Sequence, residues 1–269
     1  MKAPFISFFL KAPELKLSLK DFPFAAFSTS EIDAESLLID FPSEQMLGKQ
    51  AEFLFEQGLK HTPRFQIIAA NIQIQGATET LGELDYLVFD SKTQQTLHIE
   101  LACKFYLLDE SLGTALLDQW IGPNRKDRLQ DKLGKMKTRQ FPLLHRDETA
   151  WALNNFSVKT PVIQQQYCFK AFLFVPKGFQ QTKLPQHFQN CLVGYYMYWE
   201  QLIAEKDETA LYALPQKKQW LLPAENLMHW LSFSEAKEEI KKFITEKRSP
   251  LVYKKKNGLV EKFFVVWWD

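Results

Sequence analysis

The chain has 269 residues, of which 46% are hydrophobic and 24% charged, and its formal net charge is +1. This is an ordinary globular composition, long enough for one large domain or one domain with an appendage. The small net charge excludes a global field that draws the chain to nucleic acid or to a membrane, so any basic binding surface must be local.

Cysteine use and hydropathy indicate the compartment. The three cysteines are widely spaced and form no C-x-x-C motif, which indicates free thiols in a reducing compartment rather than a zinc site. No apolar stretch reaches the length of a membrane span, and the N-terminus lacks a signal-peptide pattern. We therefore expect a cytoplasmic protein that does not bind membranes.

The first third of the chain predicts an irregular segment, a helix and a strand. Residues 1–43 are rich in aromatic residues and prolines and predict an N-terminal extension. Ser43 then precedes apolar residues at three- and four-residue spacing, which predicts a helix capped by Ser43 and closed by Pro63. The loosely alternating residues 65–75 predict the first strand.

Residues 82–105 predict two antiparallel strands joined by a turn-like link. Residues two apart on a strand share a face, so Glu100 and Lys104 lie on one face of the second strand, while Asp85 lies on the first. If the polar faces of the two strands coincide, Asp85 and Glu100 meet. The residues do not fix the register of the pair.

A basic segment follows the second of these strands. Asn124 is the expected cap of a helix over residues 125–137, whose few apolar positions leave a strongly basic surface. A solvated amphipathic face is the default interpretation of such a helix, and phosphate binding gains weight only beside a carboxylate site. The candidate substrate-binding residues are Arg125, Lys126, Arg128, Lys132 and Lys135, with Gln140 as a weaker one.

The rest of the chain predicts further strands and one helix. The expected elements are a buried strand over 167–175, strands over 192–199 and 220–222, a helix capped by Ser232 or Ser234, and a terminal hairpin with an Asn257-Gly258 turn. We expect residues 179–269 to form a C-terminal extension packed on the core as one domain.

The predicted order helix-strand-strand-strand-helix-strand over residues 44–178 resembles the core of the PD-(D/E)XK nuclease superfamily. Gly82-Glu83-Leu84-Asp85 resembles the G-E-[IL]-D form of its motif. The resemblance implies an α/β (α+β) fold with a mixed sheet flanked by helices. The wider chain, including Trp120-Ile121-Gly122-Pro123-Asn124, resembles the bacterial domain of unknown function 1853 family, which lends no assigned activity.

The resemblance to the nuclease superfamily implies a set of site residues. Asp85 and Glu100 would bind Mg²⁺ or Mn²⁺, Lys104 would take the role of the lysine that orients the attacking water, and Glu52 would support a second metal. The superfamily lysine usually lies two residues after the acid, a place held here by Ala102. Lys104 lies four residues on, about 6–7 Å along the strand.

Simpler interpretations compete with this one. Asp85, Glu100 and Lys104 could form cross-strand ion pairs on a solvated face, and His98 is more typical of a hydrogen-bonded structural histidine than of a ligand. Three functions follow: a metal-dependent phosphodiesterase (nuclease) acting on DNA or RNA, an inactive nuclease-like domain that binds nucleic acid or a protein partner, and a structural protein or homo-oligomer that pairs through aromatic surface such as residues 263–268.

Overall fold

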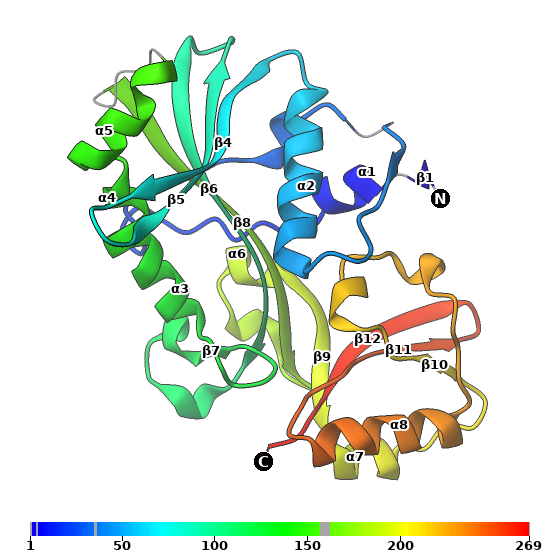
Figure 1. Ribbon diagram of the computed structural model, residues 1–269. Coiled ribbons are helices and arrows are strands. Elements are labelled where there is room, and N and C mark those ends of the chain that lie inside the picture. The colour runs from blue at the N-terminus through cyan, green and yellow to red at the C-terminus, as the bar shows by residue number, and fades with distance from the viewer. Residues whose placement is uncertain (1, 4, 35–36, 157–161, 269) are drawn as a thin grey trace. The chain divides into compact units, whose positions relative to one another are not determined.

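The computed structural model describes residues 2–3, 5–34, 37–156 and 162–268 (Figure 1). The chain divides into two compact units, each built from several segments. The first unit comprises residues 1–40, 51–103 and 131–170, and the second comprises residues 41–50, 104–130 and 171–269.

The regular elements alternate between helices and strands. The helices are α1 (Phe5–Leu10), α2 (Leu47–Lys60), α3 (Leu129–Lys135), α4 (Phe141–Leu143), α5 (Asp147–Leu153), α6 (Gln186–Gln189), α7 (Trp199–Ala204) and α8 (Phe233–Thr245). The strands are β1 (Lys2–Ala3), β2 (Ala25–Ala26), β3 (Ile39–Asp40), β4 (Phe65–Gln75), β5 (Thr80–Asp90), β6 (Gln95–Leu108), β7 (Trp120–Ile121), β8 (Ile163–Pro176), β9 (Leu192–Tyr198), β10 (Leu211–Ala213), β11 (Leu251–Lys256) and β12 (Leu259–Val266).

Within the described residues, ten of these strands form one mixed sheet in the order β10-β11-β12-β9-β8-β6-β5-β4, with β2 paired to β8 and β7 paired to β6. The β8–β9 and β9–β12 pairs are parallel, whereas β4–β5, β5–β6 and β11–β12 are antiparallel. The elements α2, β4, β5, β6, α3 and β8 follow one another in the order that the sequence predicts, and the mixed α/β class is confirmed.

Two helix starts differ from the prediction. Helix α2 begins at Leu47 rather than next to Ser43, because the preceding residues form a turn whose carbonyls the buried Gln50 amide binds, including Pro42 O at 3.2 Å. The basic helix begins at Leu129 rather than at residue 125. Arg125 has a φ of 55°, which a right-handed helix excludes.

The expected cap of that basic helix has another partner. The Asn124 side-chain oxygen accepts a hydrogen bond from the Ser249 backbone N–H at 3.0 Å, so it does not cap α3. Residues 220–222 are a turn rather than a strand, entered through a short 3₁₀ helix at Lys217–Gln219.

The C-terminal elements follow the prediction. Ser232 caps α8 in a reciprocal capping box with Glu235. Asn257 and Gly258 have φ values of 50° and 79° between β11 and β12, as a two-residue hairpin turn of the I′ type requires.

In the first unit, helices cover both faces of strands β4–β6 (Figure 1). On one face, Phe55 of α2 meets Tyr86 of β5 edge to face, with ring centroids 5.1 Å apart. A second cluster joins α4 and α5 to these strands and β8 through Ile74, Leu84, Leu87, Leu143, Leu144, Leu153 and Ile163. None of the described helices has the length and apolar composition needed to cross a bilayer.

A buried lysine fastens the N-terminal segment to β8. The ammonium of Lys170 is fully buried and donates to the carbonyls of Leu10 (2.7 Å) and Ala12 (2.9 Å), to the Thr29 hydroxyl (2.7 Å) and to Glu14 Oε1 (3.1 Å). Burial opposes the ionisation of Glu14, but the Lys170 charge and the Thr29 hydrogen bonds outweigh it and lower its pKa to about 2.

Replacement of Glu14 by Gln should leave the Lys170 charge buried without a counter-charge. We expect the free energy of unfolding at pH 7, measured by urea denaturation, to fall by about 3–5 kcal/mol. Glu44→Gln is the control, because Glu44 forms an exposed ion pair with Lys218 and its loss should change stability little. Equal effects of the two substitutions would show that Lys170 does not depend on Glu14.

Candidate active site

Asp85 and Glu100 lie where strands β5 and β6 separate. The last residue pair of the β5–β6 ladder toward the acids is Tyr86 with Ile99, and Asp85 and Glu100 are the next residues on the two strands. Beyond this point the Asp85 carboxylate replaces a backbone acceptor, since its Oδ2 accepts a hydrogen bond from the Leu101 N–H at 2.8 Å. The register that the sequence left open therefore brings the two acids together.

The neighbouring strand is distorted at the same level. On β4, Ala70 pairs with Tyr86 and Ile72 pairs with Leu84, so Asn71 is opposite Asp85. Asn71 has a φ of 54°, a left-handed conformation that few residues other than Gly and Asn adopt. Irregular backbone of this kind is a feature of functional sites.

The Asn71 side chain also lies between two carboxylates. In the amide orientation that satisfies both of them, it donates to Glu83 Oε1 at 2.9 Å and to Glu52 Oε2 at 3.2 Å. Glu52 thus faces the same strands as Asp85, and its charge acts on Asp85.

Glu100 is fully buried and is held by a chain of hydrogen bonds. Its Oε1 is 2.8 Å from His98 Nε2, and its Oε2 accepts from the Gln140 amide. The Gln165 amide donates to Phe141 O at 2.7 Å and lies 3.1 Å from His98 Nδ1. Because Gln165 presents a donor to Nδ1, a neutral His98 carries its proton on Nε2 and donates it to Glu100.

The electrostatics of the acid pair favour protonation of Asp85. Burial, followed by the charge of Glu100 and more weakly that of Glu52, raises the pKa of Asp85 to about 8. The Leu101 N–H and the Lys132 ammonium act in the opposite direction. Near neutral pH the pair therefore retains a proton that a cation of higher charge could replace.

Of the predicted basic residues, Lys132 and Gln140 belong to this site. Lys132 Nζ donates to Gln140 Oε1 at 2.9 Å, and Gln140 in turn binds Glu100. A π-helical segment, Met136–Gln140, separates α3 from α4 and places Gln140. Lys135 is exposed at the end of α3.

The other predicted residues belong to the second unit and have partners there. Lys104 Nζ is 2.9 Å from Asp127 Oδ2. Arg125 binds Asp109 at 2.7 Å and covers the Trp268 ring, while Lys126 is exposed and Arg128 forms a backbone bridge with Ile121. These residues do not share one helix face as the sequence suggested, because the helix begins only at Leu129.

The donor set of the site suits a hard cation of low protein coordination. In the described part of the chain, no three His, Cys, Asp or Glu side chains form a metal-binding group. Mg²⁺, however, usually keeps several waters and takes one or two protein carboxylates. Asp85 and Glu100 meet that requirement, with Asp85 Oδ1 accepting no hydrogen bond from any described residue.

Three residues of the site were absent from the sequence-based set. Asn71 and Gln165 were not considered, and His98 was expected to be structural. A run of three glutamines, residues 164–166, at the start of an otherwise apolar strand was the one signal for Gln165. The conformation of Asn71 leaves no signal in the sequence.

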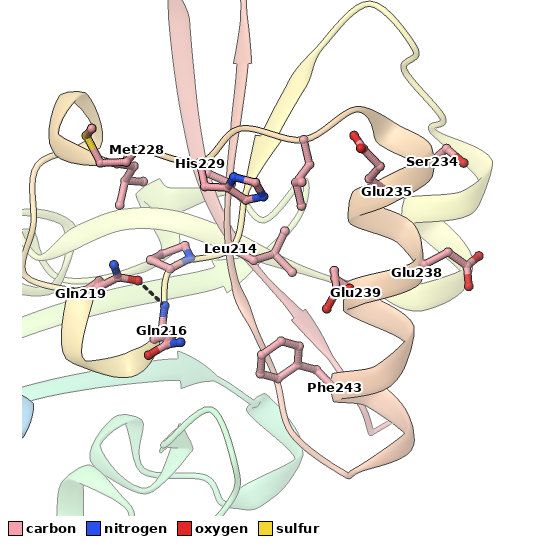
Figure 2. Close-up of a pocket in the computed structure, with 14 residues that line it drawn as sticks. Leu214, Gln216, Gln219, Met228, His229, Ser234, Glu235, Glu238, Glu239 and Phe243 are labelled. Carbon is pink, nitrogen blue, oxygen red and sulfur yellow. Dashed lines mark hydrogen bonds between the residues drawn. The ribbon is translucent and has the colours of Figure 1, made fainter.

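The second unit contains a separate hollow of about 780 Å³ between α8 and the segment before it (Figure 2). Leu214, Phe243 and other apolar residues line it together with Glu235, Glu238 and Glu239. Glu235 is held in the α8 capping box, and Glu239 is 2.6 Å from Lys242. None of the predicted site residues lines this hollow.

The fold and the acid pair define a mixed α/β protein with a carboxylate site on its central strands. Residues 23–266 match the family model described as a domain of unknown function (DUF1853), and the chain belongs to that family. Searches of curated proteins and of solved structures found no match.

The raised pKa of Asp85 makes stability depend on pH. Between about pH 4 and pH 8 the folded protein keeps a proton that the unfolded chain loses, so its unfolding free energy falls as pH rises. Asp85→Asn removes this dependence. We expect the variant to gain, relative to wild type, roughly 2 kcal/mol more at pH 8 than at pH 5.

The measurement is urea denaturation in EDTA at the two pH values. The exposed Asp33→Asn is the control and should show the same small change at both. A pH-independent effect of Asp85→Asn would contradict the electrostatic account of the acid pair.

Proposed function

We propose that this protein is a metal-dependent phosphodiesterase that acts on DNA or RNA. The observation that carries the proposal is the acid pair itself: Asp85 and Glu100 meet where two strands separate, and each disfavours the charge of the other. A divalent cation bound by both carboxylates would remove that repulsion.

The residues of the first unit have distinct roles in this proposal. Asp85 and Glu100 would hold Mg²⁺ or Mn²⁺, which as a Lewis acid withdraws charge from a phosphate and activates water. His98 and Gln165 orient Glu100, as hydrogen-bonded outer partners orient metal ligands. Glu52 adds negative charge beside Asp85.

Basic residues on α3 would meet the substrate. The exposed Lys135, together with Lys137 and Arg139 of the π segment, can bind phosphates of a nucleic acid backbone without reading its sequence. We place this activity in the cytoplasm, where the three free cysteines would remain reduced.

A second candidate is a nuclease-like domain that binds nucleic acid or a protein partner without cutting. The observation in its favour is the ion pair of Lys104 with Asp127, since this strand lysine is the one that the nuclease resemblance implicates. Both oxygens of Glu100 are also engaged by hydrogen bonds.

Cleavage of a mixed panel of single-stranded, double-stranded and branched DNA and of RNA, with Mg²⁺ or Mn²⁺, tests the first proposal. We expect metal-dependent cleavage that falls by more than about 100-fold in both Asp85→Asn and Glu100→Gln, beyond the usual loss for an outer partner. Gln165→Ala should lose about 10–100-fold, because Glu100 is then less well oriented.

Glu83→Gln is the matched control, since Glu83 is an acid two residues from Asp85 on the same strand. It should cut like wild type, and circular dichroism should show that every variant is folded. Metal-dependent cleavage that survives in folded Asp85→Asn would refute the proposal. Binding of the panel without any cleavage would favour the second candidate.

A further inference from the structure

We propose that Lys132 of helix α3, held by Gln140, is the lysine of the acid site, in place of Lys104 on the strand. Its catalytic part rests on the proposed phosphodiesterase function. Its structural part, that the Lys132 ammonium faces Asp85 and Glu100, can be tested without activity.

Hydrogen bonds connect Lys132 to the acid pair through a single side chain. Lys132 Nζ donates to Gln140 Oε1 at 2.9 Å, and the amide nitrogen of the same Gln140 donates to Glu100 Oε2. An amide that accepts from a cation and donates to a carboxylate has one orientation only. Gln140 therefore fixes the ammonium and the carboxylate relative to each other.

The helix is built to bring Lys132 and Gln140 together. In a uniform α-helix, two residues eight apart differ in direction by about 80°. The i→i+5 hydrogen bonding of the π segment widens the turn between them and reduces this difference. π-helical turns are rare and are often found at functional sites, so this one is a second, independent observation.

The charge of Lys132 also reaches Asp85. It is the cation whose field lowers the pKa of Asp85 against the effects of burial and Glu100. An ammonium in this position can hold a phosphate oxygen beside the two carboxylates and keep its proton while doing so.

Lys104 has a structural role that accounts for it fully. Its ammonium is 2.9 Å from Asp127, and the Asp127 carbonyl accepts a hydrogen bond from the Gly122 N–H at 2.8 Å. A Cβ at Gly122 would lie only 2.2 Å from Asp127 Oδ1. The Trp120–Asn124 segment therefore leaves room for the carboxylate that Lys104 binds.

The first test needs neither metal nor substrate. Reductive methylation with ¹³C-formaldehyde labels accessible lysines as dimethylammonium groups that keep their charge, and the NMR signals are assigned by their loss in Lys132→Arg and Lys104→Arg. We expect Asp85→Asn to move the Lys132 signal and not that of Lys104. Asp127→Asn should do the opposite.

The second test measures single-turnover cleavage at saturating Mn²⁺, and substrate binding in Ca²⁺ by fluorescence anisotropy. Lys132→Met should cut about 10²–10³-fold more slowly, the usual cost of losing one charge-stabilising donor, with a much smaller change in affinity. Lys104→Met should cut like wild type. Lys135→Met should weaken binding and leave the rate at saturation unchanged.

The outcomes separate this inference from the function on which it rests. If wild type cuts nothing, the phosphodiesterase proposal fails, while the Lys132 signal still shows whether its ammonium faces the acids. An unmoved Lys132 signal in Asp85→Asn overturns the inference. So does a loss of cleavage in Lys104→Met that Lys132→Met does not share.

Discussion

The arrangement around β6 follows from one constraint, a carboxylate that is completely removed from water. A buried charge is tolerated only when hydrogen bonds satisfy its lone pairs, and Glu100 obtains them from His98 and Gln140. His98 in turn requires Gln165 of β8, and Gln140 requires the π segment between α3 and α4. Side chains from two strands and one irregular helix are thereby committed to a single residue. A core without a function would have met the same space more simply with an apolar side chain.

Asp85 shows a different balance, because its surroundings disturb the sheet rather than complete it. The strand pair ends beside it, and Asn71 across the sheet adopts a left-handed conformation. Regular pairing would have enclosed Asp85 between two complete ladders. The interruption instead leaves its second oxygen available and lets α3 approach with Lys132. The two acids are thus unequal: one is fixed by its neighbours, and the other is left to exchange its proton or a cation.

Much of this could be read from local sequence patterns, and the failures have physical causes. The strand bounds of β4 and β9, the Ser232 cap and the Asn257-Gly258 turn each depend on a few adjacent residues, and all were predicted. The start of α3 was not, because a left-handed Arg125 and the contact of Asn124 with Ser249 are decided by tertiary structure. The choice between Lys104 and Lys132 is of the same kind. Spacing along a strand favours the first, whereas only the π segment reveals the second.

The buried Lys170 has a consequence for how the chain can be divided. It lies on the same strand as Gln165, five residues further on, and its charge is neutralised by groups from the first thirty residues. The N-terminal segment is therefore not a detachable tail. Removal of it would leave β8 with an uncompensated ammonium in its interior, and the strand that orients His98 would lose its place. A shortened chain beginning near residue 40 would retain every acid of the site in its sequence and lack the support that makes them a site.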